Sequence, residues 1–155
     1  MPRRTDRSAA VDIRRAGPSD LDDLVALHRA FCDIDSHPFD AVRAMAAFAP
    51  LLDDDTHGVV WIVDSPPAYA VLTWGWSIEA GGPEAVLDEI FVAERGAGVG
   101  SLLVQHVLAD AGRRGLARIF LETETHNERV RRFYRRHGFD ADDSIWMAHD
   151  FVDLS

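Results

Sequence analysis

The stretch Arg95-Gly96-Ala97-Gly98-Val99-Gly100 separates an apolar, strand-like run from a segment with helical periodicity. Three alternating glycines leave the backbone free of side chains, so several N–H groups can face one ligand. The partial positive charge at a helix N-terminus attracts an anion to the same place. The pattern therefore predicts a phosphate or pyrophosphate site at this turn. Glycines are common between strands and helices, so the identity of the ligand depends on what accompanies them.

Length and composition set the class of protein. The chain has 155 residues, of which 47% are hydrophobic and 27% charged, as is typical of one soluble globular domain. We expect residues 1–10 to be a disordered lead-in and residues 11–155 to form a single domain. No window approaches the roughly 18 uninterrupted apolar residues of a membrane span, and no secretory signal is recognisable. Cys32 is the only cysteine, which predicts a buried thiol, no internal disulfide and a cytoplasmic protein.

The charges are distributed unevenly along the chain. Residues 1–94 contain 7 arginines and 17 carboxylates, whereas residues 95–136 contain 9 arginines and 4 carboxylates. Positive potential next to the glycine turn favours an anionic ligand there. The net charge of −10 argues against nucleic acid as a partner and leaves room for a cationic one.

Apolar periodicity predicts the order β-α-α-β-β-β-α-β-α-β. Strands are expected at residues 11–14, 58–63, 68–78, 85–92, 117–121 and 144–151. Helices are expected from Ser19 or Asp20, from Pro38 to Pro50, after the glycine turn, and over residues 127–137, where Gly138 ends the last one. This order predicts one α/β layer domain with a mixed sheet.

A second patterned stretch opens with Asn127 and closes with Gly138-Phe139. Asn127 and Tyr134 are seven residues apart and therefore lie on one helix face, two turns apart. An asparagine that opens a helix is commonly a cap, and a tyrosine beside Phe133 is commonly part of a core. A functional role for Asn127 and Tyr134 remains open beside these structural interpretations.

Together the two stretches resemble the GNAT superfamily of N-acetyltransferases over roughly residues 11–151. The motifs that carry the resemblance are Ile90-Phe91-Val92 before Arg95-x-x-Gly98-x-Gly100, and Asn127-x-x-Val130-x-x-x-Tyr134-x-x-x-Gly138-Phe139. The resemblance implies an α/β fold of the α+β type, the GNAT fold, with a mixed central sheet of about six to seven strands and helices on both faces. It implies that acetyl-CoA gives its acetyl group directly to a primary amine of a small molecule or peptide, in a ternary complex and without a metal.

The resemblance also assigns roles to residues of both motifs. Tyr134 is expected to donate a proton to the thiolate that leaves, and Asn127 to contact the arm of the cofactor. The strand before the glycine turn is expected to pair with this arm, and the turn itself to hold the pyrophosphate. The expected cofactor-binding residues are therefore Asn127 and Tyr134 together with Ile90, Phe91, Val92, Arg95, Gly96, Ala97, Gly98, Val99, Gly100 and Ser101.

A general base is expected near the same strand, because an amine must lose a proton when it attacks a thioester. Asp88 and Glu89 are the candidates, and Asp88 is preferred because similar polyamine-acetylating enzymes carry a glutamate at this position. Adjacent strand residues face opposite sides, so we expect only one of the two to serve. Glu79 and Trp76, or Trp74, are expected to line the acceptor pocket.

Two other interpretations remain. A module of the same fold could bind acyl-CoA without transferring it, although Tyr134 together with Asp88 favours catalysis. A dinucleotide-binding unit could use Gly96 and Gly98 with Glu122 as the ribose-binding acid, but too little chain follows the glycines for that fold.

The expected partner is a small-molecule or peptide amine, and the acidic N-terminal half points to a cationic one. Nucleic acid and membrane are not expected as partners, and the histidines show no metal-ligand spacing. A homodimer is compatible with the family.

Overall fold

The computed structural model describes residues 10–154, so the expected lead-in at residues 1–10 lies almost wholly outside the described residues. One five-stranded sheet contains the strands in chain order. They are β1 (Ile13–Arg15), β2 (Gly58–Val63), β3 (Ala68–Ser77), β4 (Gly82–Val92) and β5 (Arg118–Phe120). The first four pair antiparallel and β5 pairs parallel with β4, which confirms the mixed sheet. Its mostly antiparallel order excludes a doubly wound parallel sheet, and with it the dinucleotide-binding interpretation.

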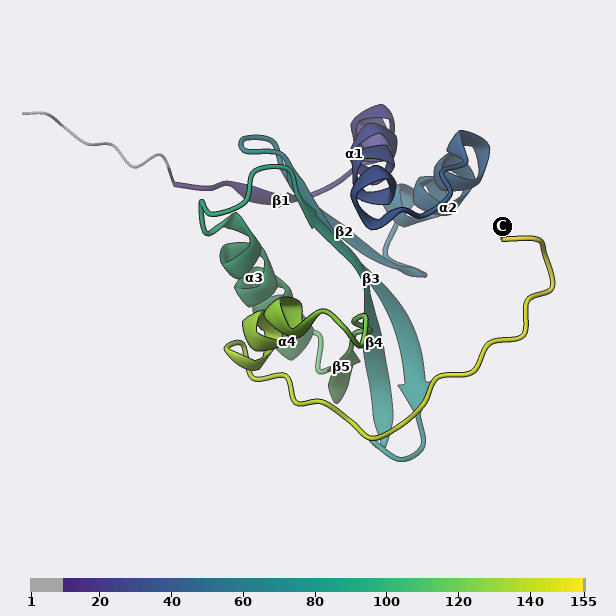
Figure 1. The fold of residues 1–155 in the computed structure, drawn as a ribbon, viewed down its shortest axis with the longest axis vertical. Helices are drawn as coiled ribbons and strands as arrows, with labels where there is room; N and C mark the ends of the chain where they lie inside the picture. The colour runs from purple at the N-terminus through teal and green to yellow at the C-terminus, as the bar shows by residue number, and fades with distance from the viewer. Residues whose placement is uncertain (1–9, 155) are drawn as a thin grey trace, which may run out of the picture.

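Helices cover both faces of the sheet (Figure 1). A short 3-10 turn, η1 (Pro18–Asp20), leads into α1 (Leu21–Asp35), and α1 and α2 (Ala41–Asp53) cover one face. The other face carries α3 (Val99–Arg113) and α4 (Glu128–Arg135). The predicted arrangement of helices on both faces is confirmed.

Side chains of β3 alternate between two cores, one on each face of the sheet. Ala70 and Leu72 are fully buried against the α3 face, with Leu103 and Val107 of that helix. Tyr69 points to the α1–α2 face, where its ring meets Phe48 of α2 edge-on at 6.0 Å. Because both faces of the sheet are covered, the sequence of β3 is a nearly continuous run of apolar residues and does not alternate between apolar and polar ones.

The strand expected at residues 144–151 is wrong: residues 140–154 contain no helix or strand, and the sheet has five strands instead of six to seven. Within this segment, Asp142 Oδ1 accepts a hydrogen bond from the Ser144 N–H at 2.8 Å. Such a turn takes the chain out of the extended conformation that pairing needs. The segment instead passes Phe120 of β5, where Trp146 packs edge-on, and ends beside α2 (Figure 1).

Pro50 does not end α2, which continues to Asp53. Proline inside a helix leaves the carbonyl four residues earlier without its usual N–H partner. Here that carbonyl belongs to Ala46, and both residues are exposed, so water can replace the missing donor. Burial of Leu51 and Leu52 holds the last turn of the helix against the sheet.

Candidate active site

The register between β4 and β3 shifts by one residue at Asp88. Leu72 pairs with Leu87, whereas the preceding Val71 pairs with Glu89, so Asp88 is the extra residue of a β-bulge. A one-residue shift moves the following side chains to the other face of the sheet. Leu87 therefore packs in the core under α3, while Glu89 meets residues of α1.

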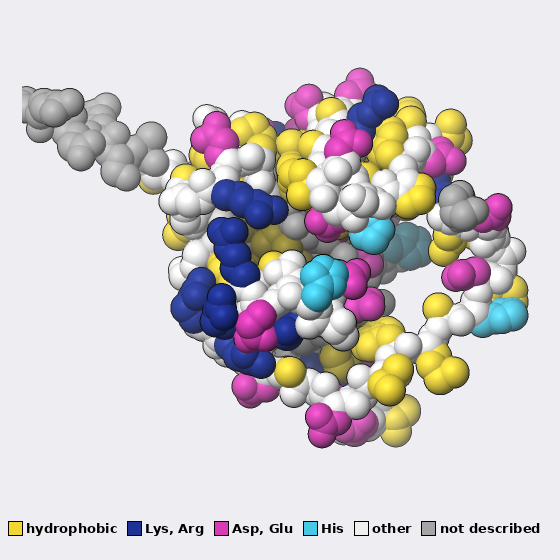
Figure 2. Space-filling model, in the orientation of Figure 1, with side chains coloured by type: hydrophobic (Ala, Val, Ile, Leu, Met, Phe, Trp, Pro, Cys, Tyr) yellow, Lys and Arg dark blue, Asp and Glu magenta, His cyan; other side chains and the backbone are white. Residues whose placement is uncertain are grey.

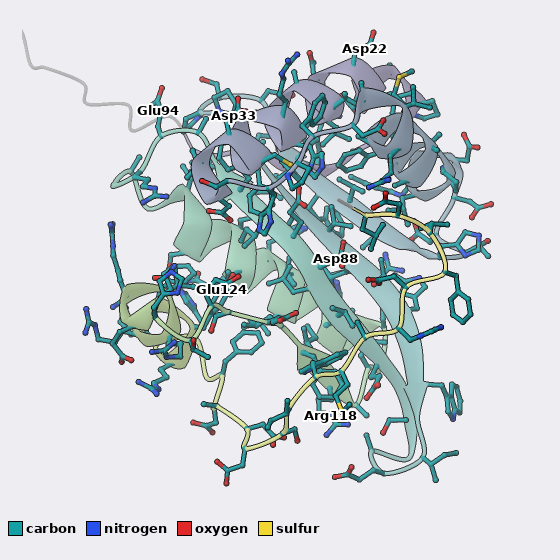
Figure 3. All side chains as sticks on the ribbon, turned by 45° about the vertical axis from the view of Figure 1, so that its right-hand side comes forward. Asp22, Asp33, Asp88, Glu94, Arg118 and Glu124 are labelled. Atoms are coloured by element: carbon teal, nitrogen blue, oxygen red, sulfur yellow. The ribbon has the colours of Figure 1, made fainter. Side chains whose placement is uncertain are left out.

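A cavity of about 100 Å³ lies at this bulge, against α1 and α2. Asp88, Glu89 and His28 form its polar side, and Figure 3 shows Asp88 midway along the sheet. The remaining lining is apolar and consists of Ala44, Ala47, Phe48, Leu51 and Val71. Strand alternation predicts that the two carboxylates face opposite sides of the sheet, but the bulge lets both line the same cavity. That only one of them serves as the base stays a prediction.

Glu89 is the centre of a hydrogen-bonded group. Its Oε1 accepts a hydrogen bond from the Tyr69 hydroxyl and lies 2.7 Å from Nδ1 of His28. Burial, with the nearby Glu89 carboxylate, raises the pKa of Tyr69, so this phenol stays a neutral donor. Asp88 is exposed and has no hydrogen bond or ion pair with any of residues 10–154. The two neighbouring carboxylates thus differ: Glu89 is held by partners and Asp88 is free.

Cys32 lies behind this group, with its Sγ 3.5 Å from Nε2 of His28. The thiol is buried, as predicted, and burial raises its pKa. A neutral thiol is a poor nucleophile, so Cys32 is a packing neighbour of His28 rather than a reactive group.

On the opposite side of β4, the glycine turn leads into α3. Gly96 has a φ of 90° and Gly98 a φ of 76°, conformations that side chains other than glycine rarely adopt. Gly98 is the N-cap residue of α3, and no side chain caps the first-turn N–H groups. A Cβ at either glycine would have no heavy atom within 4 Å outside its immediate neighbours. The backbone donors are therefore open to an anionic ligand, and the residues present fit a pyrophosphate.

The backbone edge of β4 connects the glycine turn to the cavity. β5 pairs with β4 only where Arg118–Phe120 lies beside Glu84–Val86. From Leu87 to Val92, β4 has no strand on that side among the described residues. Unpaired strand groups of this kind readily accept an extended partner. The free edge thus runs from the bulge at Asp88 toward the start of α3.

Tyr134 lies in the core beneath α3, with its ring edge-on to Phe133 at 5.2 Å and to Phe139 at 5.6 Å. Its hydroxyl has no hydrogen-bond partner within residues 10–154. Burial raises the pKa of Tyr134 to about 12, so the phenol keeps its proton at neutral pH. Gly138, with a φ of 86°, ends this helical stretch as predicted.

Asn127 is the N-cap of α4, where its Oδ1 accepts a hydrogen bond from the Val130 N–H at 3.2 Å. The capping interpretation is therefore confirmed. The amide NH₂ of the same side chain is left to donate to another group.

The surface of α4 is rich in arginine and lies close to the start of α3. His137 Nε2 is 2.9 Å from Ser101 Oγ, which ties the two helices together. Arg95, Arg129 and Arg132 are exposed and have no ion pair within the described part of the chain. Figure 2 shows basic side chains gathered on this side of the molecule, whereas acidic side chains predominate over α1 and the C-terminal segment. This charge distribution favours an anion at the glycine turn.

Three residues expected in the acceptor pocket lie elsewhere. Trp76 and Glu79 are exposed at the end of the β3–β4 hairpin, outside the cavity at Asp88. Trp74 donates its indole N–H to the Asp55 carbonyl at 2.7 Å, and its ring packs under a guanidinium of α3's C-terminal end. A larger hollow, about 310 Å³, lies between α3, β5 and residues 137–139, and neither Asp88 nor the glycine turn lines it.

His28 and Tyr69, which hold Glu89, were not among the residues predicted for the site. His28 lies on α1, 61 residues before its partner. Nothing in the local sequence around either residue marks it as functional, since each looks like an ordinary member of an apolar helix face or strand. The register of β3 with β4 brings Tyr69 to Glu89, and the packing of α1 on the sheet brings His28 to it.

Within residues 10–154, no three His, Cys, Asp or Glu side chains gather closely enough to hold a metal ion. In the same part of the chain, no helix combines the length and the apolar character needed to cross a membrane.

These features define an α/β domain with an uncapped helix N-terminus on one sheet face and, on the other, a cavity with two carboxylates on one side. A sequence profile of the acetyltransferase (GNAT) family matches residues 22–139, and the chain belongs to this family. No curated protein sequence matches the chain.

Several solved structures share the fold. An integron cassette protein from the mobile metagenome of Cole Harbour Salt Marsh is 27% identical, with 91% of each chain covered and a TM-score of 0.80. A protein of Arthrobacter sp. FB24, described as a proposed acetyltransferase, is 27% identical, with 96% of this chain and 100% of that chain covered and a TM-score of 0.75. An aminoglycoside N-acetyltransferase, AAC(6')-Iy, in complex with CoA is similar in fold alone, at 20% identity, coverage of 95% and 99%, and a TM-score of 0.75.

Proposed function

We propose that the protein transfers the acetyl group of acetyl-CoA directly to a primary amine while both substrates are bound. The observation that carries this proposal is the free edge of β4, because it joins the open glycine turn to the cavity that Asp88 and Glu89 line. An extended arm along this edge would start at an anion site and end beside two carboxylates.

Acetyl-CoA would supply the acetyl group as a reactive thioester. The N–H groups from Gly98 to Ser101 would hold its pyrophosphate, with Arg95 and the α4 arginines adding positive potential. The backbone of Ile90–Val92 would pair with the pantetheine arm, as strand edges do with extended partners. Asn127 would donate from its free NH₂, since its oxygen already caps α4.

The amine has to lose its proton to form the amide, and the sulfur has to gain one as it leaves. Asp88 is the base we favour, because its carboxylate is free whereas that of Glu89 is held by His28 and Tyr69. Glu89 would contribute negative charge that attracts the ammonium form of the acceptor. Tyr134 would give its phenolic proton to the sulfur, a role that a buried, protonated phenol suits.

The test is release of free thiol from acetyl-CoA in the presence of a panel of primary amines, with the product mass measured. We expect thiol release that depends on the amine, and a product heavier than the amine by one acetyl group. Glu79→Gln, a carboxylate removed at the hairpin end outside the cavity, serves as the matched control and should leave the rate unchanged. Tight binding of acetyl-CoA without thiol release on any amine would instead favour a module that binds the cofactor and does not transfer acetyl.

A further inference from the structure

The lining of the cavity at Asp88 narrows the class of acceptor. We infer that this cavity binds a primary amine carried on a compact apolar group, in preference to a polyamine or an aminoglycoside. The inference rests on the proposed function for the reaction, but it concerns binding in the cavity and can be tested without turnover.

The cavity offers charge on one side only. His28, Asp88 and Glu89 supply every titratable group of its lining. The other lining residues come from α2 and β3, and among them Phe48, Leu51 and Val71 are buried. An ammonium placed beside Asp88 and Glu89 has opposite charges to meet, whereas a second ammonium or a set of hydroxyls would face hydrocarbon. Taking such groups out of water without a partner is unfavourable.

Two of the three polar residues of the cavity, His28 and Glu89, are held by neighbouring side chains. The imidazole of His28 lies among three phenylalanine rings, with centroids 6.1 Å from Phe31, 5.9 Å from Phe39 and 6.0 Å from Phe48. Its Nδ1 is fixed on Glu89. Because ring faces attract cations as well as apolar groups, Phe48 can contact an alkylammonium on either part. An acceptor with one charged end and one apolar body therefore matches the polar and the apolar side of the cavity lining.

The volume of the cavity also favours a compact acceptor. The cavity measures about 100 Å³, whereas a cavity of roughly 150 Å³ holds a benzene molecule. A short alkyl chain or part of a small ring fits inside, whereas a multi-ring sugar has to extend out of the cavity, whose lining residues Ala47 and Asp88 are exposed.

Most acidic residues of the N-terminal half lie outside the cavity. Asp22 and Asp33 lie on α1 and, like most carboxylates of this half, are exposed at the surface (Figure 3). Only Asp88 and Glu89 among the described carboxylates line the cavity. The cationic acceptor expected from overall charge is thereby reduced to a single ammonium at one defined place.

The test compares n-butylamine and 1,4-diaminobutane, which share a four-carbon chain and differ by one ammonium. Their binding to the protein saturated with CoA is measured by calorimetry. We expect n-butylamine to bind at least about tenfold more tightly, since the second ammonium of the diamine meets no partner. Equal or tighter binding of the diamine, or no binding of either amine, would overturn the inference.

Two matched variants test whether the cavity lining sets the preference between the two amines. Ala47→Glu adds a carboxylate to the apolar rim of the cavity and should shift the preference toward the diamine. Ala46→Glu adds the same charge to an exposed position of the same helix outside the cavity and should leave the preference unchanged. A shift of equal size in both variants would mean that surface charge, and not the cavity, sets the preference.

Thiol release with the same two amines separates this inference from the proposed function. If n-butylamine binds more tightly but no thiol is released, the proposed transfer fails and the cavity assignment stands. If thiol is released fastest with the diamine, transfer stands and the cavity assignment fails.

Discussion

The two faces of the sheet present different kinds of binding atoms. On the α3–α4 face, the donors are backbone groups of the glycine turn, of the uncapped first turn of α3 and of the free edge of β4. On the α1–α2 face, the polar groups are the side chains of Asp88, Glu89 and His28. A backbone site depends on glycine spacing within a few residues, whereas the side-chain site depends on a bulge and on an α1 residue 61 positions away. Substitutions on the α3–α4 face should therefore change binding of the cofactor, and substitutions on the α1–α2 face should change turnover of the amine.

The largest effect is expected at the backbone site. Gly98→Val puts a β-branched side chain at a φ of 76° and fills the open turn. Left-handed backbone costs such residues about 1–2 kcal/mol, and the added methyl groups occupy the space of the ligand. We expect acetyl-CoA binding to be abolished in calorimetry.

Gly112→Ala is the matched control for that substitution. Gly112 lies near the other end of α3, where a Cβ meets no atom within 4 Å and the backbone is not left-handed. It should bind acetyl-CoA as the unmodified protein does. Unchanged cofactor binding in Gly98→Val would remove the glycine turn from the account.

Asp88→Asn should separate the effect on turnover from the effect on cofactor binding most clearly. Removing the free carboxylate is expected to lower kcat/KM by about 1,000-fold, within the range of general base catalysis, while the affinity for acetyl-CoA is unchanged. Steady-state kinetics and calorimetry measure the two quantities. If Glu89→Gln shows the larger loss instead, the base is the residue held by His28 and Tyr69.

Tyr134 lies on the α4 side of the sheet, and in the proposed reaction it gives its proton to the leaving sulfur. Its pKa is raised to about 12, so the phenol is protonated throughout the pH range 6 to 10 and its contribution should not titrate there. Tyr134→Phe is expected to lower kcat by about 100-fold at every pH in that range. A ratio of the two rates that falls as pH rises within it would mean that the proton comes from another group.

The smallest effect concerns stability on the side-chain face. Asp20, which is buried, receives two guanidinium hydrogen bonds from Arg14 at 2.8 and 2.9 Å and one from the Gly17 N–H. Asp20→Asn should lower the free energy of unfolding by about 1–3 kcal/mol at pH 7, without changing the affinity for acetyl-CoA.

The pH dependence of this effect follows from the pKa of Asp20, which the Arg14 hydrogen bonds lower from the usual value. The native state then holds the proton less tightly than the unfolded chain. The contribution is present above the ordinary pKa of the carboxyl and is lost as pH falls through the lowered one. Urea denaturation at pH 7 and pH 3 should therefore show the two proteins converging at the lower pH. A difference of the same size at both pH values would assign the effect to packing.

The sequence allowed prediction of the backbone face to a large extent. Glycines at residues 96 and 98, the helix after them and Gly138 at the end of the last helical stretch are local signals, and all three appear where expected. The five strands that form follow runs of apolar residues with turns between them. The strand at residues 144–151 failed because apolar residues alone do not provide a pairing partner or exclude a turn at Asp142.

The side-chain face was predictable only in part. Asp88 and Glu89 stood out as carboxylates in an otherwise apolar strand, but their shared orientation required a bulge that strand periodicity does not reveal. His28 and Tyr69 became relevant only through pairing across the sheet and packing of α1 on it. Trp76 and Glu79 were expected in the pocket because large aromatic and acidic residues suit one, yet Trp76 near the end of β3 and Glu79 in the following turn lie outside the cavity at Asp88.

The most direct test of the whole account measures thiol release from acetyl-CoA with n-butylamine as acceptor, together with the mass of the product. We expect thiol release that requires the amine, formation of N-butylacetamide, and loss of both in Gly98→Val and in Asp88→Asn. We further expect that only Gly98→Val loses cofactor binding. Thiol release that is independent of the amine, or the same in Asp88→Asn as in the unmodified protein, would contradict the division of the site between the two faces of the sheet.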